Sequence, residues 1–209
     1  PDEFIPLAEQ SGLIKPLTMW VLHNSLAECQ RCIQKGHNIR VSINLSMKNL
    51  TEQNIADEII DILNQYEFSA ARLKLEITET ALMDNPKAVI EALDRLNARG
   101  LHISIDDFGV GYSSLTYLQQ LPVDELKIDK SFNLSLLNDT NSTVIVRSTI
   151  DMAHKLGLCV VAEGVETKET LGLLQELGCD SAQGFYLGRP MPMPEMLAWV
   201  AENNWENAV

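Results

Sequence analysis

The chain has 209 residues, of which 45% are hydrophobic and 22% are charged, so it can bury a substantial core and is not an intrinsically disordered chain. Its formal net charge of −13 argues against DNA binding, because phosphate backbones are held by clustered Lys and Arg side chains. The sequence shows neither an apolar run long enough to span a membrane nor a secretory leader, so we expect a cytoplasmic chain without membrane contact from this segment.

In chain order, the sequence predicts a regular alternation of helices and strands after a first loop and short helix. Helix, glycine and strand recur at Gly36, Gly100, Gly157 and Gly178, which indicates consecutive βα units and a mainly parallel sheet. No linker divides the chain, so we interpret residues 1–209 as a single domain, with fewer strands than the eight of a closed (β/α)8 barrel. The predicted elements are helix 16–35, strand 39–46, helix 51–66, strand 73–78, helix 86–100, strand 102–107, a short helix ending near 120, strand 125–129, helix 141–155, strand 158–163, helix 167–177, strand 181–187 and a helix from 194.

Two cysteines, Cys29 and Cys32, have the CxxC spacing of many zinc sites. No second pair completes such a site, and both cysteines fall within a helical pattern. We interpret them, together with Cys159 and Cys179, as thiols in a reducing compartment.

Alternation along the predicted strands places polar side chains on one face of the sheet and apolar side chains on the other. Helices must cover the apolar face, so the polar face points into the barrel, where branched apolar side chains would be usual. Buried charges need partners, and polar residues near the carboxyl ends of barrel strands indicate an active site lined with metal ligands. The alternative is a salt-bridge network without function. The residues concerned are Asn44, Glu76, Asp106, Lys127 and Glu163.

The stretch HISIDDFGVGYSS, residues 102–114, brings two adjacent carboxylates to the end of a strand and continues into a loop with two glycines. Asp106 and Asp107 repel each other at neutral pH unless a cation, a hydrogen-bond network or a shared proton compensates. A divalent metal is the strongest candidate, and oxygen ligands from Asp, Glu and Asn suit Mg²⁺ or Mn²⁺. Gly109 and Gly111 allow a sharp turn over such a site.

Seven segments carry a resemblance to a known family, and they are FIPLAEQSGLI, SINLS, LEITET, SIDDFGVGYSSL, LKIDKSF, VVAEGVET and QGFYLGRP. In this order they resemble the EAL domain, the family of cyclic di-GMP phosphodiesterases, over nearly the whole chain. The resemblance implies a TIM-like (β/α)8 barrel modified by an antiparallel strand near its start. It also implies hydrolysis of cyclic di-GMP to linear pGpG by a two-metal mechanism, in bacterial second-messenger signalling.

The same resemblance implies a set of metal ligands. Asn44, Glu76 and Asp106 would hold one Mg²⁺ or Mn²⁺ ion. Asp106 would bridge to a second ion, which Asp107 would also hold. Two cations would lower the pKa of a bound water and stabilise the charge of an in-line phosphoryl displacement.

Other matched residues would act on the water and the substrate. Glu163 would orient or deprotonate the attacking water, and Lys127 would hold that water or a phosphate oxygen. Gln183 would lie near the metals at the substrate. Glu79 and Glu166 resemble residues that support the acidic loop and the wall of the site.

The chain departs from the family pattern at two places. The glutamate of the motif that names the family, a further metal ligand on an earlier strand, has no counterpart in these residues. We therefore expect a missing N-terminal segment of roughly 30 residues or more, and little activity from the chain without it. Val110 also occupies a loop position where the family pattern predicts Thr or Ala.

The resemblance leaves partners and two alternative functions open. We expect cyclic di-GMP as ligand, a homodimer through the loop 108–114 and the helix after it, and sensory or GGDEF domains N-terminal in the parent protein. A catalytically inactive EAL-like module, acting as a cyclic di-GMP receptor or in protein interaction, is the alternative function. A sugar-processing barrel is weaker, because two adjacent aspartates in one loop are poorly placed to flank a glycosidic bond.

Overall fold

The computed structural model describes residues 1, 3–78, 86–111 and 118–203. Its strands are β1 (Val41–Asn44), β2 (Leu73–Thr78), β3 (His102–Phe108), β4 (Glu125–Ile128), β5 (Cys159–Ala162) and β6 (Ser181–Ala182). Its helices are α1 (Phe4–Ser11), α2 (Ile14–Gln34), α3 (Met47–Leu50), α4 (Ile55–Gln65), the 3₁₀ helix η1 (Ala70–Arg72), α5 (Pro86–Asn97), α7 (Lys130–Ser135), α8 (Thr140–Lys155), α9 (Lys168–Glu176) and α10 (Met193–Glu202).

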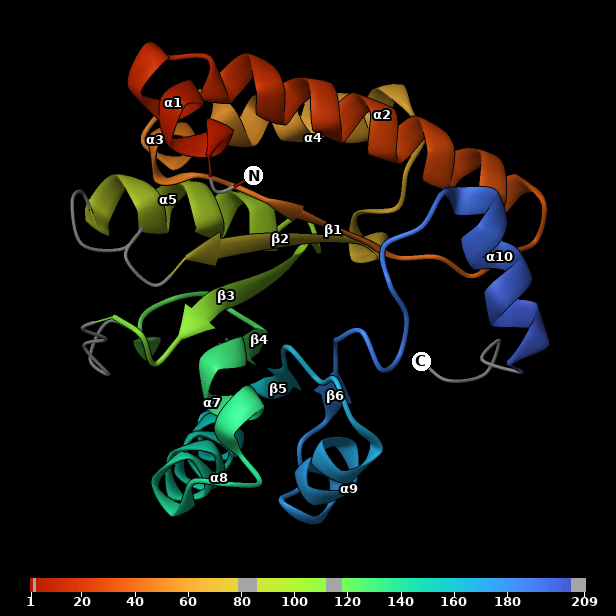
Figure 1. The fold of residues 1–209 in the computed structure, drawn as a ribbon. Coiled ribbons are helices and arrows are strands. Elements are labelled where there is room, and N and C mark those ends of the chain that lie inside the picture. Colours follow the sequence, from red (N-terminus) through yellow and green to blue (C-terminus); the bar gives the residue numbers. More distant parts are fainter. Residues whose placement is uncertain (2, 79–85, 112–117, 204–209) are drawn as a thin grey trace.

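The six strands form one parallel sheet in the order β1-β2-β3-β4-β5-β6. Figure 1 shows the sheet curving from β1 to β6, with α2, α4 and α5 on the side of β1 to β3 and α8 and α9 beside the later strands. The antiparallel strand implied by the family resemblance is not among these six described strands. Parallel pairing aligns all carboxyl ends at one edge, which is where the predicted site residues lie.

The core lies between the apolar face of the sheet and the helices. On the strands, Ile43, Leu75, Ile103 and Leu126 are almost fully buried, as the alternation predicted. Burying each such side chain contributes about 1.5–3 kcal/mol. The helices supply their own apolar rows, and the buried members include Leu22, Leu26, Ile55, Ile59, Leu93, Leu96, Val146 and Ile150.

Several predicted elements differ from the structure, and the helix predicted over 51–66 begins only at Ile55. The strand predicted over 39–46 is only Val41–Asn44, because Ser46 already caps α3 by accepting a hydrogen bond from Asn49 N. The strand predicted over 181–187 ends at Ala182, and the chain then turns, with Leu187 N donating to Gly184 O. Helix α7 was not predicted, because its six residues are too few to show helical periodicity.

The turn after β6 depends on Gly184. A Cβ at this position would lie 2.2 Å from the carbonyl oxygen and 2.3 Å from the nitrogen of Val165, which is far inside van der Waals contact. The same close approach allows Val165 N to donate to Gln183 O and Tyr186 N to donate to Val165 O, both at 3.0 Å. The segments after β5 and β6 are therefore held together through their backbones.

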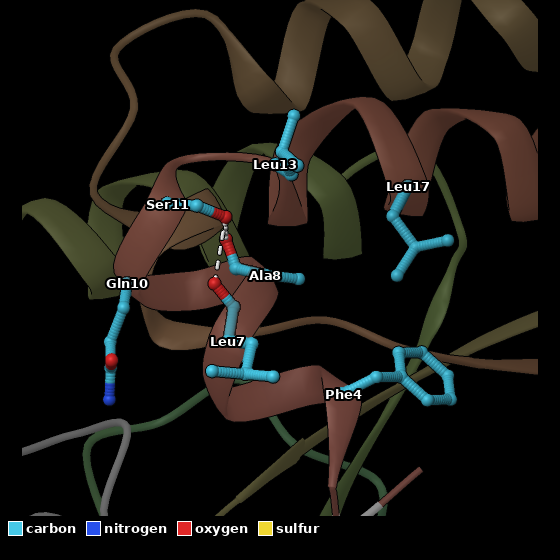
Figure 2. A pocket seen from close by; sticks show the side chains of 7 residues that line it. All are labelled: Phe4, Leu7, Ala8, Gln10, Ser11, Leu13 and Leu17. Carbon is cyan, nitrogen blue, oxygen red and sulfur yellow. Dashed lines mark hydrogen bonds between the residues drawn. The ribbon is translucent and has the colours of Figure 1, made fainter.

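An apolar hollow lies apart from the polar residues of the sheet, between α1 and the start of α2 (Figure 2). Within this hollow, Ser11 Oγ donates a hydrogen bond to the carbonyl oxygen of Leu7, one turn earlier in the same helix, at 2.7 Å. The lining contains no charged side chain; it consists of Phe4, Leu7, Ala8, Gln10, Ser11, Leu13 and Leu17. None of the helices in the described part of the chain is long and apolar enough to cross a membrane.

Candidate active site

A buried lysine at the carboxyl ends of the strands is the centre of the site. Lys127 on β4 is only 3% exposed, and its Nζ lies 2.9 Å from Glu76 Oε2, 2.9 Å from Asp106 Oδ1 and 2.7 Å from Glu163 Oε1. Burial alone would favour the neutral amine, but the bonds to Glu163, Asp106 and Glu76 outweigh it and raise the pKa of Lys127. The ammonium group is therefore charged, and three carboxylates surround it, from β2, from β3 and from the residue that follows β5.

A β-bulge brings both aspartates of β3 to this cluster. Ile105 pairs with Leu126 and Phe108 with Ile128, so two residues on β3 stand opposite Lys127 alone. Asp107 is the extra residue and has a left-handed backbone, with φ of 55°, which aspartate tolerates better than most residues. Regular alternation would send the two neighbouring side chains to opposite faces. The bulge interrupts this alternation, and carboxylate oxygens of Asp106 and Asp107 lie within 4.8 Å of each other.

Asp106, Asp107 and Glu163 form a group that fits a metal ion. Each offers one carboxylate oxygen, and these oxygens all lie within 4.8 Å of one another. Such hard oxygen donors, without sulfur or imidazole, suit Mg²⁺ or Mn²⁺. The donor set therefore agrees with the metals expected from the sequence.

Glu163 directly follows β5, and its backbone is fixed from two sides. Its N–H donates to Ile128 O at 3.2 Å, and its carbonyl accepts a hydrogen bond from Asn133 Nδ2 at 2.8 Å. Burial raises the pKa of the Glu163 carboxyl, against the opposing effect of Lys127. A carboxylate with a raised pKa is a better proton acceptor, which suits a general base.

Asp129, at the end of β4, is a further carboxylate beside the site. It is not among the site residues predicted from the sequence. Burial and the neighbouring carboxylates of Asp106 and Asp129 raise the pKa of Asp107. Burial acts the same way on Asp129, but hydrogen bonds from Ser131 outweigh it and lower the pKa of Asp129. Its position beside a strand end was the only signal that could have indicated it.

Asn44, Gln183 and Glu166 are not among the carboxylates that contact Lys127. Asn44 is exposed at the end of β1 and pairs in register with Glu76. Gln183 is exposed after β6, and its N–H donates to Ala162 O at 2.8 Å, next to Glu163. Glu166 is exposed three residues beyond Glu163. Glu79 lies outside the described residues.

The carboxylate cluster and the parallel sheet are the setting for a comparison with known families. The model of the EAL domain matches residues 1–190. The chain belongs to the EAL domain family. This membership confirms the resemblance seen in the sequence motifs.

Curated relatives of this EAL chain include two proteins of Pseudomonas aeruginosa. The bifunctional diguanylate cyclase/cyclic di-GMP phosphodiesterase MucR is 41% identical over 202 residues, covering 96% of this chain and 30% of MucR. The cyclic di-GMP phosphodiesterase NbdA is 43% identical over 194 residues, covering 92% of this chain and 25% of NbdA. The chain thus spans less than a third of the length of these two relatives.

Solved EAL structures confirm the fold. The MucR phosphodiesterase in complex with c-di-GMP superposes with a TM-score of 0.90 and 40% identity, over 94% of this chain and 80% of that one. The EAL enzyme Bd1971, with cAMP and cyclic di-GMP bound, gives a TM-score of 0.89 and 32% identity, over 96% of this chain and 55% of that one. The curved parallel sheet is therefore the part of the TIM-like EAL barrel that these residues contribute.

Proposed function

We propose that residues 1–209 form one EAL-type domain of a cyclic di-GMP phosphodiesterase, which hydrolyses cyclic di-GMP to linear pGpG with two Mg²⁺ or Mn²⁺ ions. One observation carries the proposal: Glu76, Asp106 and Glu163 gather around Lys127, with Asp107 beside them. An inactive relative would be expected to have lost some of these side chains. The identity of 41–43% to named phosphodiesterases supports the same activity.

The proposed division of labour follows from position and charge. Asn44, Glu76, Asp106 and Asp107 would hold the cations, which would supply a water of lowered pKa and neutralise charge on the phosphoryl group. Binding of cations would offset the excess of carboxylates over the ammonium group of Lys127 in this cluster.

Glu163 would then orient the attacking water and accept its proton, since burial raises its pKa. Lys127 would donate to the water or to a phosphate oxygen from its fixed position. Gln183 would contact the substrate beside Glu163, and Glu79 and Glu166 would support the acidic loop and the wall of the site. The glutamate expected on a strand before Pro1 stays a prediction.

The same proposal covers location and partners. The cysteines Cys29, Cys32, Cys159 and Cys179 are free thiols, which fits a reducing cytoplasm. We propose a homodimer through the loop 108–114 and the helix after it. Val110 in that loop is 65% exposed, whereas residues 112–117 lie outside the described residues. We also propose further sensory or GGDEF domains in the parent protein, as the length of the curated relatives suggests.

The test of the function is product release by the full-length natural protein. Cyclic di-GMP is incubated with the protein and Mn²⁺, and linear pGpG is measured by chromatography. We expect turnover that stops when the metal is chelated and returns when Mn²⁺ is added. Binding of cyclic di-GMP without any product would refute the enzyme and support the receptor function. A sedimentation experiment that finds only monomer at every concentration would refute the dimer.

A further inference from the structure

Helix α7 lies between the two segments that carry the acidic groups of the site. Its first turn begins directly after Asp129, whose carboxylate accepts a hydrogen bond from Ser131 N at 2.9 Å. The cap fixes where the helix starts relative to β4. Residues of this turn then contact the backbone that follows Asp107 on one side and Glu163 on the other.

The contact with the first segment is made by Phe132. A Cβ added to Gly109 would lie 2.9 Å from Cε2 of Phe132, so the aromatic ring rests directly on the backbone two residues after Asp107. Gly109 has φ of 101°, a conformation that side chains rarely permit. The backbone that follows Asp106 and Asp107 thus packs directly against α7.

The contacts with the second segment are made by Lys130 and Asn133. A Cβ added to Gly164 would lie 2.5 Å from Cβ and 3.2 Å from Cα of Lys130, so the two backbones touch next to Glu163. Asn133 is 1% exposed, and its Nδ2 donates to Glu163 O at 2.8 Å and to Ile128 O at 3.4 Å. The amide therefore ties the end of β4 to the residue proposed as the base.

Asn133 is an unfavourable choice for stability alone. Its Oδ1 is buried and has no hydrogen-bond partner, and such an unsatisfied acceptor costs about 1–3 kcal/mol. An apolar side chain of the same size would remove this unpaired acceptor, but it would also remove the hydrogen bond to Glu163 O. A residue that breaks a local rule in this way is often found beside a functional site.

We propose that the first turn of α7 is a positioning element, which sets the spacing between the Asp106–Asp107 segment and Glu163. Phe132 positions the first segment and Asn133 positions the second. This inference rests on the proposed function, because the spacing matters for holding a cation next to the base. Neither residue touches the reacting atoms, so each acts through the backbone of its neighbour.

Hydrogen exchange of the metal-free full-length protein tests the two contacts separately. We expect Phe132→Ala to speed amide exchange in residues 106–111 and to leave residues 163–165 unchanged. We expect Asn133→Leu to speed exchange in residues 163–165 and to leave residues 106–111 unchanged. The amides of β1 and β2 report global destabilisation, which would speed exchange everywhere. Phe132→Leu keeps an apolar contact and should give an intermediate effect. Leu134→Ala, on the exposed side of α7, is the control and should change neither segment.

Metal binding and turnover test the consequence. Phe132→Ala should weaken Mn²⁺ binding, measured by calorimetry without substrate, by about 10-fold. Asn133→Leu should lower kcat by about 10-fold with little change in Mn²⁺ affinity. The melting temperature should fall only modestly, because the change removes the unpaired Oδ1 but also leaves Glu163 O without the Asn133 donor.

The two proposals fail in different ways. If both variants keep wild-type exchange in their segments, or if both segments change together with β1 and β2, α7 has only a structural role and the inference is wrong. If the wild-type protein binds Mn²⁺ but releases no pGpG, the proposed function is wrong, while the exchange and Mn²⁺ measurements still decide on positioning.

Discussion

Two layers of side chains on the inner face of the same sheet use the same residue types with different charge balance. In the layer toward the amino ends of the strands, Lys74 Nζ lies 2.6 Å from Glu125 Oε2, and Ser104 donates to Glu125 Oε1 at 2.9 Å. One positive charge there meets one negative charge. In the layer toward the carboxyl ends, Lys127 meets three carboxylates.

On the proposed function, the layer toward the amino ends (the lower layer) is a structural ion pair, and the layer toward the carboxyl ends (the upper layer) is the metal site. The lower layer needs no further charge, because each group has its partner. The upper layer contains more negative charge than Lys127 can balance. Burial raises the pKa of both Asp107 and Glu163 in this layer. A divalent cation would complete the upper layer and would add nothing to the lower one.

The largest expected effect comes from removing one carboxylate in each layer. Asp106→Asn should lower turnover by at least about 100-fold, since even outer partners of metal ligands are worth 10- to 100-fold. The matched change in the lower layer, Glu125→Gln, should leave turnover nearly unchanged. The assay is pGpG release at micromolar Mn²⁺, with the melting temperature showing that both variants fold. Full activity of Asp106→Asn would contradict the metal site.

Removing the lysine of each layer gives the next largest effect, now on stability. Lys127→Met leaves buried carboxylates unpaired and should lower the free energy of unfolding of the metal-free protein by about 3–5 kcal/mol. Lys74→Met, in a partly exposed pair, should cost only about 1–2 kcal/mol. Urea unfolding in the presence of a chelator measures both. Added Mn²⁺ should stabilise both variants by binding to the folded state, and it should stabilise Lys127→Met more, because the cation also compensates the carboxylates left without the lysine. An equal gain in both variants would contradict the distinction between the layers.

A smaller effect is expected from pH acting on the upper layer. Because the pKa of Asp107 is raised in the folded state, the folded protein holds this proton more tightly than the unfolded chain. Its contribution to stability therefore falls as pH rises above the ordinary value of 3.8. Asp107→Asn should gain stability relative to the metal-free wild type as pH rises from about 4 to about 7. Urea unfolding across this range tests it, and a constant or opposite difference would contradict it.

The smallest effect should come from the neutral member of the lower layer. Ser104→Ala removes one hydrogen bond to Glu125 and should lower the free energy of unfolding by about 1 kcal/mol. Turnover should not change, because Ser104 supports a balanced ion pair rather than the cluster. A large loss of activity in this variant would show that the two layers are coupled.

The sequence predicted the sheet and much of the cluster, because both depend on alternation. Polar residues two apart along β2, β3 and β4 had to share a face, which brought Glu76, Asp106 and Lys127 together. The apolar residues between them had to form the core. Alternation also placed Glu163, the first residue after β5, on this face, and the family motifs gave it a role.

The rest depends on contacts that alternation does not encode. The bulge that turns Asp107 to the same end as Asp106 comes from pairing with β4, and no pattern within β3 indicates it. Helix α7 is too short for periodicity, and the bond from Asn133 to Glu163 O joins residues 30 positions apart. The short β6 follows from the contact of Gly184 with Val165, which is visible only once the two segments are placed side by side.

Gly184 also has a consequence for how related sequences should vary. Because any side chain there would overlap the backbone of Val165, selection against substitution acts on folding and is independent of turnover. Homologues that have lost the catalytic carboxylates during evolution should therefore still keep this glycine. In a comparison of many EAL sequences, position 184 would report descent with the same architecture, whereas positions 106 and 107 would report whether a lineage has retained its enzymatic activity.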